Sequence, residues 1–298
     1  MKNNKNYPTL CPYCNSSIKI YRRGFFIRAS DKKKIQKYSC KNCSKHFSDQ
    51  TLSYDYRLRK RYINQKTFRF ICKGMSQRAT ALLLGVKQKA IALRIKRFAV
   101  VAKKFLQNTR KNENINEVFF DEMETFEHTK CKPVTIPLAV NPANRKILAL
   151  AVGTIPAKGH LVDIALKKYG PRQCQRKEKI TEMLTDIVSN QTQKIKFSTD
   201  ESPFYPNLIK KIAPGSIHLG FKGRRGCVVG QGELKAGGYD PLFPLNHTCA
   251  MIRDNVKRLT RRTWCTTKKI FMLENILYIY AMFHNLVIDG ASLKIFNC

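Results

Sequence analysis

Acidic residues are scarce in this sequence. Its 20 Asp and Glu stand against 56 Lys and Arg, which gives a formal net charge of +36 at pH 7. It also lacks an apolar run of the ~20 residues that a membrane-spanning helix needs. A charge this positive indicates a polyanionic partner, and nucleic acid is the first candidate because each neutralised phosphate releases a counterion. Hydrophobic residues still make up 43% of the chain, which excludes a wholly disordered protein.

The charge is unevenly distributed. Residues 1–111 hold 29 basic and 3 acidic side chains, whereas residues 112–298 hold 27 and 17. The first part is therefore expected to dock on DNA or RNA, and any metal-dependent chemistry would use carboxylates of the second part. The start MKNNKNYPTL lacks the apolar segment of a secretory signal, and the 11 cysteines are an odd number. Both features favour a reducing, cytoplasmic compartment.

Two Cys-x-x-Cys pairs stand 25 residues apart near the start of the chain, formed by Cys11, Cys14, Cys40 and Cys43. This spacing predicts a structural Zn²⁺ site of four thiolates, which leaves no open coordination position. His46 is an alternative fourth ligand. A redox pair is less favoured, because such a motif normally occurs once and inside a βαβ unit. With a hairpin pattern at residues 18–27, the pairs predict a zinc ribbon over residues 1–55.

Residues 74–98 have the pattern of a helix-turn-helix, within a DNA-binding region expected over residues 56–112. Ser76 is the expected N-cap, Ala79, Leu82 and Leu83 recur with helical spacing, and Gly85 supplies a tight turn. In the second helix, the side chains expected to contact DNA are Lys87, Lys89, Arg94, Lys96 and Arg97. An ordinary basic helical hairpin remains the alternative.

The pattern changes after a polar segment at residues 103–116. Strands are expected at residues 117–126, 134–140, 146–154, 194–199 and 216–221, and helices at 161–169, 177–189, from about 203, 249–263 and 270–286. This order predicts a mixed α+β or α/β domain over residues 113–298. It is the order of the ribonuclease-H-like fold, with a mixed five-stranded sheet in which the fourth strand lies beside the first.

Two aspartates occupy strand positions that otherwise favour apolar residues. Asp121 interrupts the first strand, and Asp200 ends the fourth. Carboxylates on neighbouring strands repel one another unless a divalent cation lies between them, and Mg²⁺ is the expected ion. Two such ions would support an in-line displacement at a phosphate.

A third ligand is expected from a helix in the segment 244–269, which also carries a basic stripe. Arg253, Lys257 and Arg261 are four residues apart, and Arg258 and Arg262 adjoin them. Such a stripe suits a phosphate backbone, and without a polyanion the face would repel itself.

On these residues the sequence resembles insertion-sequence transposases of the DDE superfamily, in the insertion-sequence-one-like group. The resemblance rests on the paired Cys motifs, Phe120-Asp-Glu122, Ser198-Thr-Asp200 followed by Tyr205, and the basic segment 257–265. It implies Mg²⁺- or Mn²⁺-dependent cleavage of double-stranded DNA at the element's terminal inverted repeats, and strand transfer to a target. It also implies at least two protein copies in a synaptic complex, in the nucleoid of a prokaryote.

By matching position, the resemblance implies that Asp121 and Asp200 are the first two catalytic carboxylates. The third position departs from the Glu of many relatives, because it holds Asn246, followed by His247. An amide oxygen still ligates a hard cation but adds no charge, and His247 would contact the scissile phosphate. Substitute ligands are Glu233, Asp240 and Asp254, whereas Glu122 should point to the opposite face of the strand.

Two other functions stay open. One is a zinc-ribbon and helix-turn-helix DNA-binding protein whose second part is an inactive ribonuclease-H-like domain. The other is a ribonuclease-H-type nuclease that cleaves without joining ends.

Overall fold

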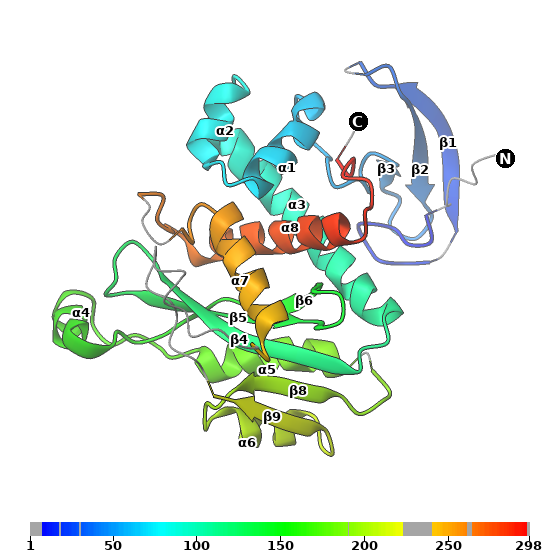
Figure 1. The fold of residues 1–298 in the computed structure, drawn as a ribbon. Helices are drawn as coiled ribbons and strands as arrows, with labels where there is room; N and C mark the ends of the chain where they lie inside the picture. Colours follow the sequence, from blue (N-terminus) through cyan, green and yellow to red (C-terminus); the bar gives the residue numbers. More distant parts are fainter. Residues whose placement is uncertain are drawn as a thin grey trace. The chain divides into compact units, whose positions relative to one another are not determined.

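The computed structural model describes residues 8–17, 19–29, 31–189, 191–222, 240–260 and 264–296. The chain divides into two compact units, Met1–Asn64 (unit 1) and Gln65–Asn297 (unit 2) (Figure 1). The sequence predicted three domains, with boundaries at residues 55 and 112. A boundary lies near the first of these, but none falls at the second.

Unit 1 is a three-stranded antiparallel sheet. Its strands are β1 (Ile20–Ile27), β2 (Lys34–Cys40) and β3 (His46–Ser48), in that order, followed by the short helix η1 (Arg61–Ile63). A bulge at Gly24, with a φ of 74°, shifts the register of β1 against β2. The small core joins two of the paired cysteines to apolar residues: Cys11, Ile20, Tyr38, Cys40 and Phe47. The hairpin predicted within residues 18–27 was wrong, because residues 20–27 form the single strand β1, which pairs with β2.

Unit 2 begins with three helices, α1 (Asn64–Cys72), α2 (Gln77–Leu83) and α3 (Gln88–Asn112). Ser76 caps α2, because its hydroxyl accepts a hydrogen bond from the Ala79 N–H at 3.1 Å. At the other end Val86 N–H donates to the Ala81 carbonyl and Gly85, with a φ of 59°, donates to Leu82. These bonds form a Schellman motif, so the predicted cap and turn are both present.

Leu82 and Leu83, which recur with helical spacing, are 82% and 62% exposed, whereas Thr80 and Ala81 form the buried face of α2. The polar segment from Lys103 was open to two interpretations, a linker or the end of a helix. It is the end of a helix, because α3 continues to Asn112 with one buried residue per turn.

The buried face of α3 packs on α8 (Ile270–Ile288), and Phe98 stacks on Phe296 with ring centroids 4.0 Å apart. Phe68 of α1 contacts Phe283 of α8 and Phe296 edge-on. The helices of the predicted DNA-binding region therefore share a core with the C-terminal part of the chain.

A mixed six-stranded sheet forms the centre of unit 2. Its strands are β4 (Glu117–Phe126), β5 (Pro133–Val140), β6 (Ile147–Leu150), β7 (Gly153–Thr154), β8 (Lys196–Asp200) and β9 (Ile217–Phe221). The order is β6-β5-β4-β8-β9, and β7 pairs with β5. The pairs β4/β5 and β5/β6 are antiparallel, and the pairs β4/β8 and β8/β9 are parallel. The sequence predicted that the fourth strand of this region lies beside the first, and the pairing of β8 with β4 confirms this prediction.

The sequence predicted five strands because residues 146–154 read as one strand. The ladder is interrupted opposite Pro137, which has no N–H to donate, and pairing resumes between Thr135 and Gly153. The single strand predicted at residues 146–154 is therefore two strands, β6 and β7.

Helices cover both faces of the sheet (Figure 1). The remaining helices are η2 (Gly159–Leu161), α4 (Val162–Tyr169), α5 (Arg176–Val188), α6 (Tyr205–Ile212) and α7 (Phe243–Asn255). α5 and α6 pack on the face that carries Val118, Phe120 and Phe197. α7 packs on β4 and β5.

The edge strand β6 is closed by side chains from α3 and α8. Arg110 donates to the Leu148 carbonyl, Tyr278 donates to Leu150, and the Asn285 amide bonds both backbone groups of Ile147. These bonds leave little of the edge open to another strand.

Among the described helices, α8 is the one whose length and composition would allow it to cross a membrane. Of its most apolar window, 61% is buried inside the protein. The sequence predicted a buried core helix here, and the packing of α8 on α3 and β6 agrees with that prediction.

Candidate functional site

The four paired cysteines of unit 1 lie together. Their Sγ atoms are all within 4.8 Å of one another, with Cys11 to Cys43 and Cys14 to Cys40 each at 3.7 Å. Tetrahedral Zn²⁺ with bonds of about 2.3 Å to sulfur places two thiolates about 3.8 Å apart, whereas a disulfide requires about 2.0 Å. The cluster therefore fits a metal ion such as zinc. His46 is exposed and does not belong to it.

The two Cys-x-x-Cys motifs have similar local backbones. The residue after each pair, Asn15 or Ser44, has a positive φ of 53° or 56°, which turns the chain back around the sulfurs. Hydrogen bonds from the Ser16 backbone and the Asn42 amide lower the pKa of Cys14 to about 6. Cys14 is thus favoured as a thiolate, the form that binds metal. At Cys43 a backbone hydrogen bond from Lys45 lowers the pKa, but burial and hydrogen bonds with the other three thiols outweigh it and raise the pKa to about 11.

Asp121 and Asp200 lie on one face of two adjacent strands. β4 and β8 run parallel with Phe119 opposite Ser198, so two residues further on Asp121 stands beside Asp200. Because side chains alternate along a strand, both point away from the α5 and α6 core. The predicted pair is therefore brought together.

The environment of Asp121 opposes its charge. Burial raises the pKa of Asp121 to about 6, and the carboxylates of Asp200 and Glu122 add to the rise. A cation bound between the two aspartates would relieve this repulsion. The donor set, two carboxylates on one face, fits a hard divalent ion.

α7 crosses this face. It begins above the start of β4, where Pro244 and Phe119 line one cavity of about 480 Å³. Further along α7, the buried Cys249 interacts electrostatically with Asp121, and burial raises the pKa of this thiol to about 12. Cys249 could not be identified from the sequence, because a lone cysteine has no spacing to interpret.

The predicted third ligand has a different bonding partner. Asn246 is exposed on the first turn of α7, and its amide NH₂ donates to the Asp240 carboxylate at 3.0 Å. His247 packs against the Phe243 ring at 5.6 Å, and it interacts with His284 of α8, whose pKa is lowered by burial and further by His247.

No third acidic ligand joins the aspartates in the described part of the chain. Within it, the four cysteines are the one group of three or more His, Cys, Asp and Glu side chains close enough to share a metal ion. Asp240 bonds Asn246, Asp254 is exposed at the end of α7, and Glu122 faces away as predicted. Glu233 lies outside the described residues.

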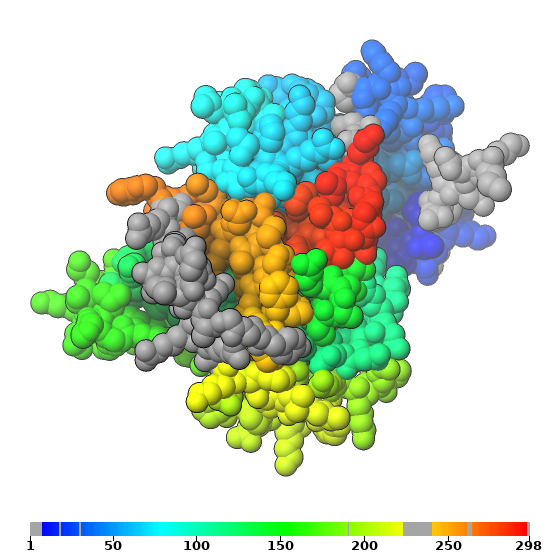
Figure 2. All heavy atoms as spheres, viewed as in Figure 1, coloured from blue at the N-terminus to red at the C-terminus, as the bar shows by residue number. Residues whose placement is uncertain are grey.

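The basic stripe of the sequence prediction does not form on one helix. α7 lies on the surface of unit 2 (Figure 2, orange) and ends at Asn255, so Arg253 is on the helix while Lys257 and Arg258 follow it. Lys257 is exposed, and burial lowers the pKa of Arg258. Arg261 and Arg262 lie outside the described residues.

The predicted helix-turn-helix residues divide into two groups. Lys87, Lys89 and Arg97 are exposed, and Lys96 is exposed with its Nζ 5.3 Å from the centre of the Phe271 ring. Arg94 is 3% exposed and donates to the Ala90 carbonyl. Its prediction as a DNA contact was wrong, because it lies on the buried side of α3 with Ile91 and Ile95.

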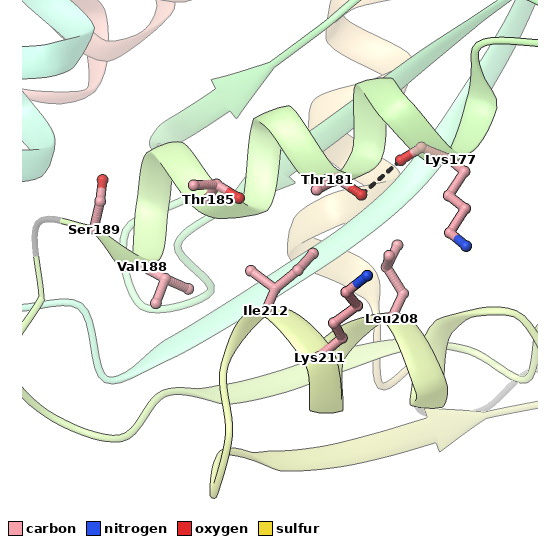
Figure 3. Close-up of a pocket in the computed structure, with 8 residues that line it drawn as sticks. All are labelled: Lys177, Thr181, Thr185, Val188, Ser189, Leu208, Lys211 and Ile212. Carbon is pink, nitrogen blue, oxygen red and sulfur yellow. Dashed lines mark hydrogen bonds between the residues drawn. The ribbon is translucent and has the colours of Figure 1, made fainter.

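A groove of about 420 Å³ lies between α5 and α6, on the opposite face of the sheet from Asp121 (Figure 3). Lys177 and Lys211 flank it, and the Thr181 hydroxyl on its wall donates to the Lys177 carbonyl. None of the residues predicted for catalysis, DNA binding or metal binding lines it.

Neither models of known protein families nor curated proteins match this chain.

Proposed function

We propose that the protein is a DNA transposase of the DDE superfamily. Unit 1 is its zinc ribbon, α1 to α3 form its helix-turn-helix region, and the six-stranded sheet with α4 to α8 is its ribonuclease-H-like catalytic region. One observation carries the proposal: Asp121 and Asp200 stand side by side on one face of adjacent parallel strands. The strand order β6-β5-β4-β8-β9, with parallel pairing from β4 onward, is the order expected of that fold.

In the proposed site, Asp121 and Asp200 hold Mg²⁺ or Mn²⁺ through their carboxylate oxygens. A divalent cation there would polarise a phosphate and make the attacking water a better nucleophile. In this proposal Arg253 on α7 and the exposed Lys257 after it hold the DNA backbone, and the exposed Lys87, Lys89 and Arg97 position the element's end.

The proposed reaction has two displacements at phosphorus. Water first forms a bond to phosphorus at the element's end while the bond to the 3′ oxygen breaks, and this oxygen leaves as a hydroxyl group with a proton. The 3′ hydroxyl then attacks a target phosphate, loses its proton and displaces another 3′ oxygen. Joining two ends requires at least two protein copies. We place this activity in the cytoplasm, at the nucleoid of a prokaryote.

A second candidate is a DNA-binding protein with an inactive catalytic region. It is favoured by the engagement of the Asn246 amide with Asp240, and by the absence of a third acidic ligand among the described residues.

Asp200→Asn tests the proposal against a matched control, Glu201→Gln, which removes an exposed charge from the next residue. Wild-type protein is incubated with Mg²⁺ or Mn²⁺, labelled DNA carrying the element's ends, and a target plasmid. We expect cleaved and joined products, a loss of more than about 100-fold in Asp200→Asn, and no change in Glu201→Gln.

Binding without cleavage by wild type would support the second candidate. Cleavage without joining, lost in Asp200→Asn, would instead indicate a nuclease. Products that persist in Asp200→Asn would contradict the assigned site.

A further inference from the structure

Behind the aspartate pair, on the opposite face of β4, lies a buried carboxylate with three donors. The Glu122 side chain is 7% exposed. It accepts hydrogen bonds from the Thr135 hydroxyl at 2.6 Å, from Arg176 Nε at 2.5 Å and from the Tyr205 hydroxyl at 3.1 Å. Its charge is thus paired and its oxygens are satisfied.

The three donors come from three different elements. Thr135 belongs to β5, Arg176 is the first residue of α5, and Tyr205 is the first residue of α6. Tyr205 also follows Asp200 by five residues. Its ring is buried and packs edge-on against Phe120 of β4, with centroids 4.9 Å apart. Glu122 therefore links the strand of Asp121 to the segment that leaves Asp200.

We propose that Glu122, Arg176 and Tyr205 form a brace that sets the separation of Asp121 and Asp200. Glu122 is the next residue after Asp121, so fixing its side chain fixes the backbone that carries the catalytic carboxylate. Tyr205 fixes the β8–α6 connection in the same way. The two aspartates repel one another without a cation, and the brace opposes that repulsion from the back of the sheet.

The brace rests on the proposed function, because it positions the proposed metal ligands. Its residues touch neither metal nor DNA, so they are positioning residues. The prediction that distinguishes this role from simple structural support is a loss of metal affinity in a protein that stays folded.

The test measures Mn²⁺ binding by electron paramagnetic resonance, together with thermal unfolding, in the full-length protein. The variants are Glu122→Gln and Tyr205→Phe, and Tyr205→Phe removes a single hydroxyl while keeping the buried ring. Glu124→Gln is the matched control: it lies on the same face of β4, and its carboxylate is 49% exposed and pairs with Lys158. Asp121→Asn reports binding at the aspartate pair.

We expect Asp121→Asn to abolish Mn²⁺ binding, both brace variants to weaken binding by about 10- to 100-fold, and Glu124→Gln to bind as wild type does. If Glu122→Gln does not fold, the Mn²⁺ affinity of Tyr205→Phe tests the proposal by itself. Folded brace variants with wild-type Mn²⁺ affinity would overturn the brace and leave the proposed function standing. Wild type that binds no Mn²⁺, or Asp121→Asn that binds it equally well, would overturn both.

Discussion

Asp121 is a partly buried carboxyl whose nearest neighbours on the same face of β4, Phe119 and Met123, are apolar. Its pKa is raised by burial to about 6, so its ionised form destabilises the folded state above pH 6. Below the ordinary pKa of an aspartate, near 4, this penalty disappears. Without added Mg²⁺, we therefore expect Asp121→Asn to be more stable than wild type at pH 8 by about 1–3 kcal/mol, and equally stable at pH 4.

Urea denaturation at pH 8, 6 and 4 measures this difference. Glu201→Gln serves as the control, because Glu201 is exposed and should show no such pH dependence. Added Mg²⁺ should stabilise wild type at pH 8 and leave Asp121→Asn unchanged. A variant that is less stable than wild type at pH 8 would show that the charge of Asp121 is favourably paired in the metal-free fold.

Individual residues also show what can and what cannot be predicted from the sequence. Asp121 and Asp200 could be identified because a carboxylate in an apolar strand pattern is conspicuous. Arg94 could not be placed, because a long cationic side chain on a helix can bond its own helix, here the Ala90 carbonyl, instead of reaching solvent. Arg176 gave no signal, since its partner Glu122 is 54 residues away in the chain.

The structural elements were predicted well where hydrophobic periodicity was strong. β4 covers residues 117–126 as predicted, α4, α5 and β9 begin and end within a few residues of their predicted positions, and α6 begins where a helix was predicted. Both ends of α7 were predicted wrongly, because the helix spans Phe243–Asn255 and not residues 249–263. Side-chain donors, instead of further helical turns, satisfy its last carbonyls. The Asn255 amide and the Tyr280 hydroxyl both donate to the Met251 carbonyl, and the Thr260 hydroxyl donates to Arg253.

The next prediction concerns α3, whose exposed Lys and Arg side chains in its first half are expected to bind DNA phosphates. If Lys89 and Arg97 contact phosphates, each alanine substitution should weaken binding of any DNA duplex by about 3- to 10-fold. Each should also reduce the slope of log K against log salt concentration by about 1. Lys104→Ala, an exposed site further along the same helix, is the control. Fluorescence anisotropy titrations at about 50 to 200 mM salt measure both the affinity and the salt slope. Unchanged slopes in both variants would exclude this part of α3 from the DNA interface.

At the scale of the whole molecule, the two units depend on different cores. Unit 2 has a large apolar core between its sheet, α5 and α6, together with the aromatic contacts of α1, α3 and α8. The sequence could not reveal that the predicted second and third domains share this structure, because nothing in the pattern of α3 shows that its partner, α8, lies near the other end of the chain. By contrast, the four cysteines were identified from spacing alone, since four ligands of one ion must meet.

Unit 1 has a core in which two of five fully packed side chains are cysteines, and it carries 16 basic against 3 acidic residues. About 64 residues with this charge and so little apolar burial are marginal as an independent fold. Bringing four thiolates to one ion would supply the missing stability, so folding of unit 1 should be coupled to zinc.

We therefore expect removal of zinc by a chelator, or Cys43→Ser, to unfold unit 1 while unit 2 remains folded. Limited trypsin digestion followed by mass spectrometry measures this, because unit 1 contains many cleavage sites between Lys19 and Arg61. In metal-free protein these sites should be cut first, and the sites within α3 and α5 should stay protected.

Cys174→Ser is the control, since Cys174 is exposed and lies outside the cluster. A zinc content of about one ion per chain should fall in Cys43→Ser alone. If unit 1 resisted trypsin equally well without metal, its sheet would have to be stable by apolar packing alone, and the four cysteines would be no more than close neighbours.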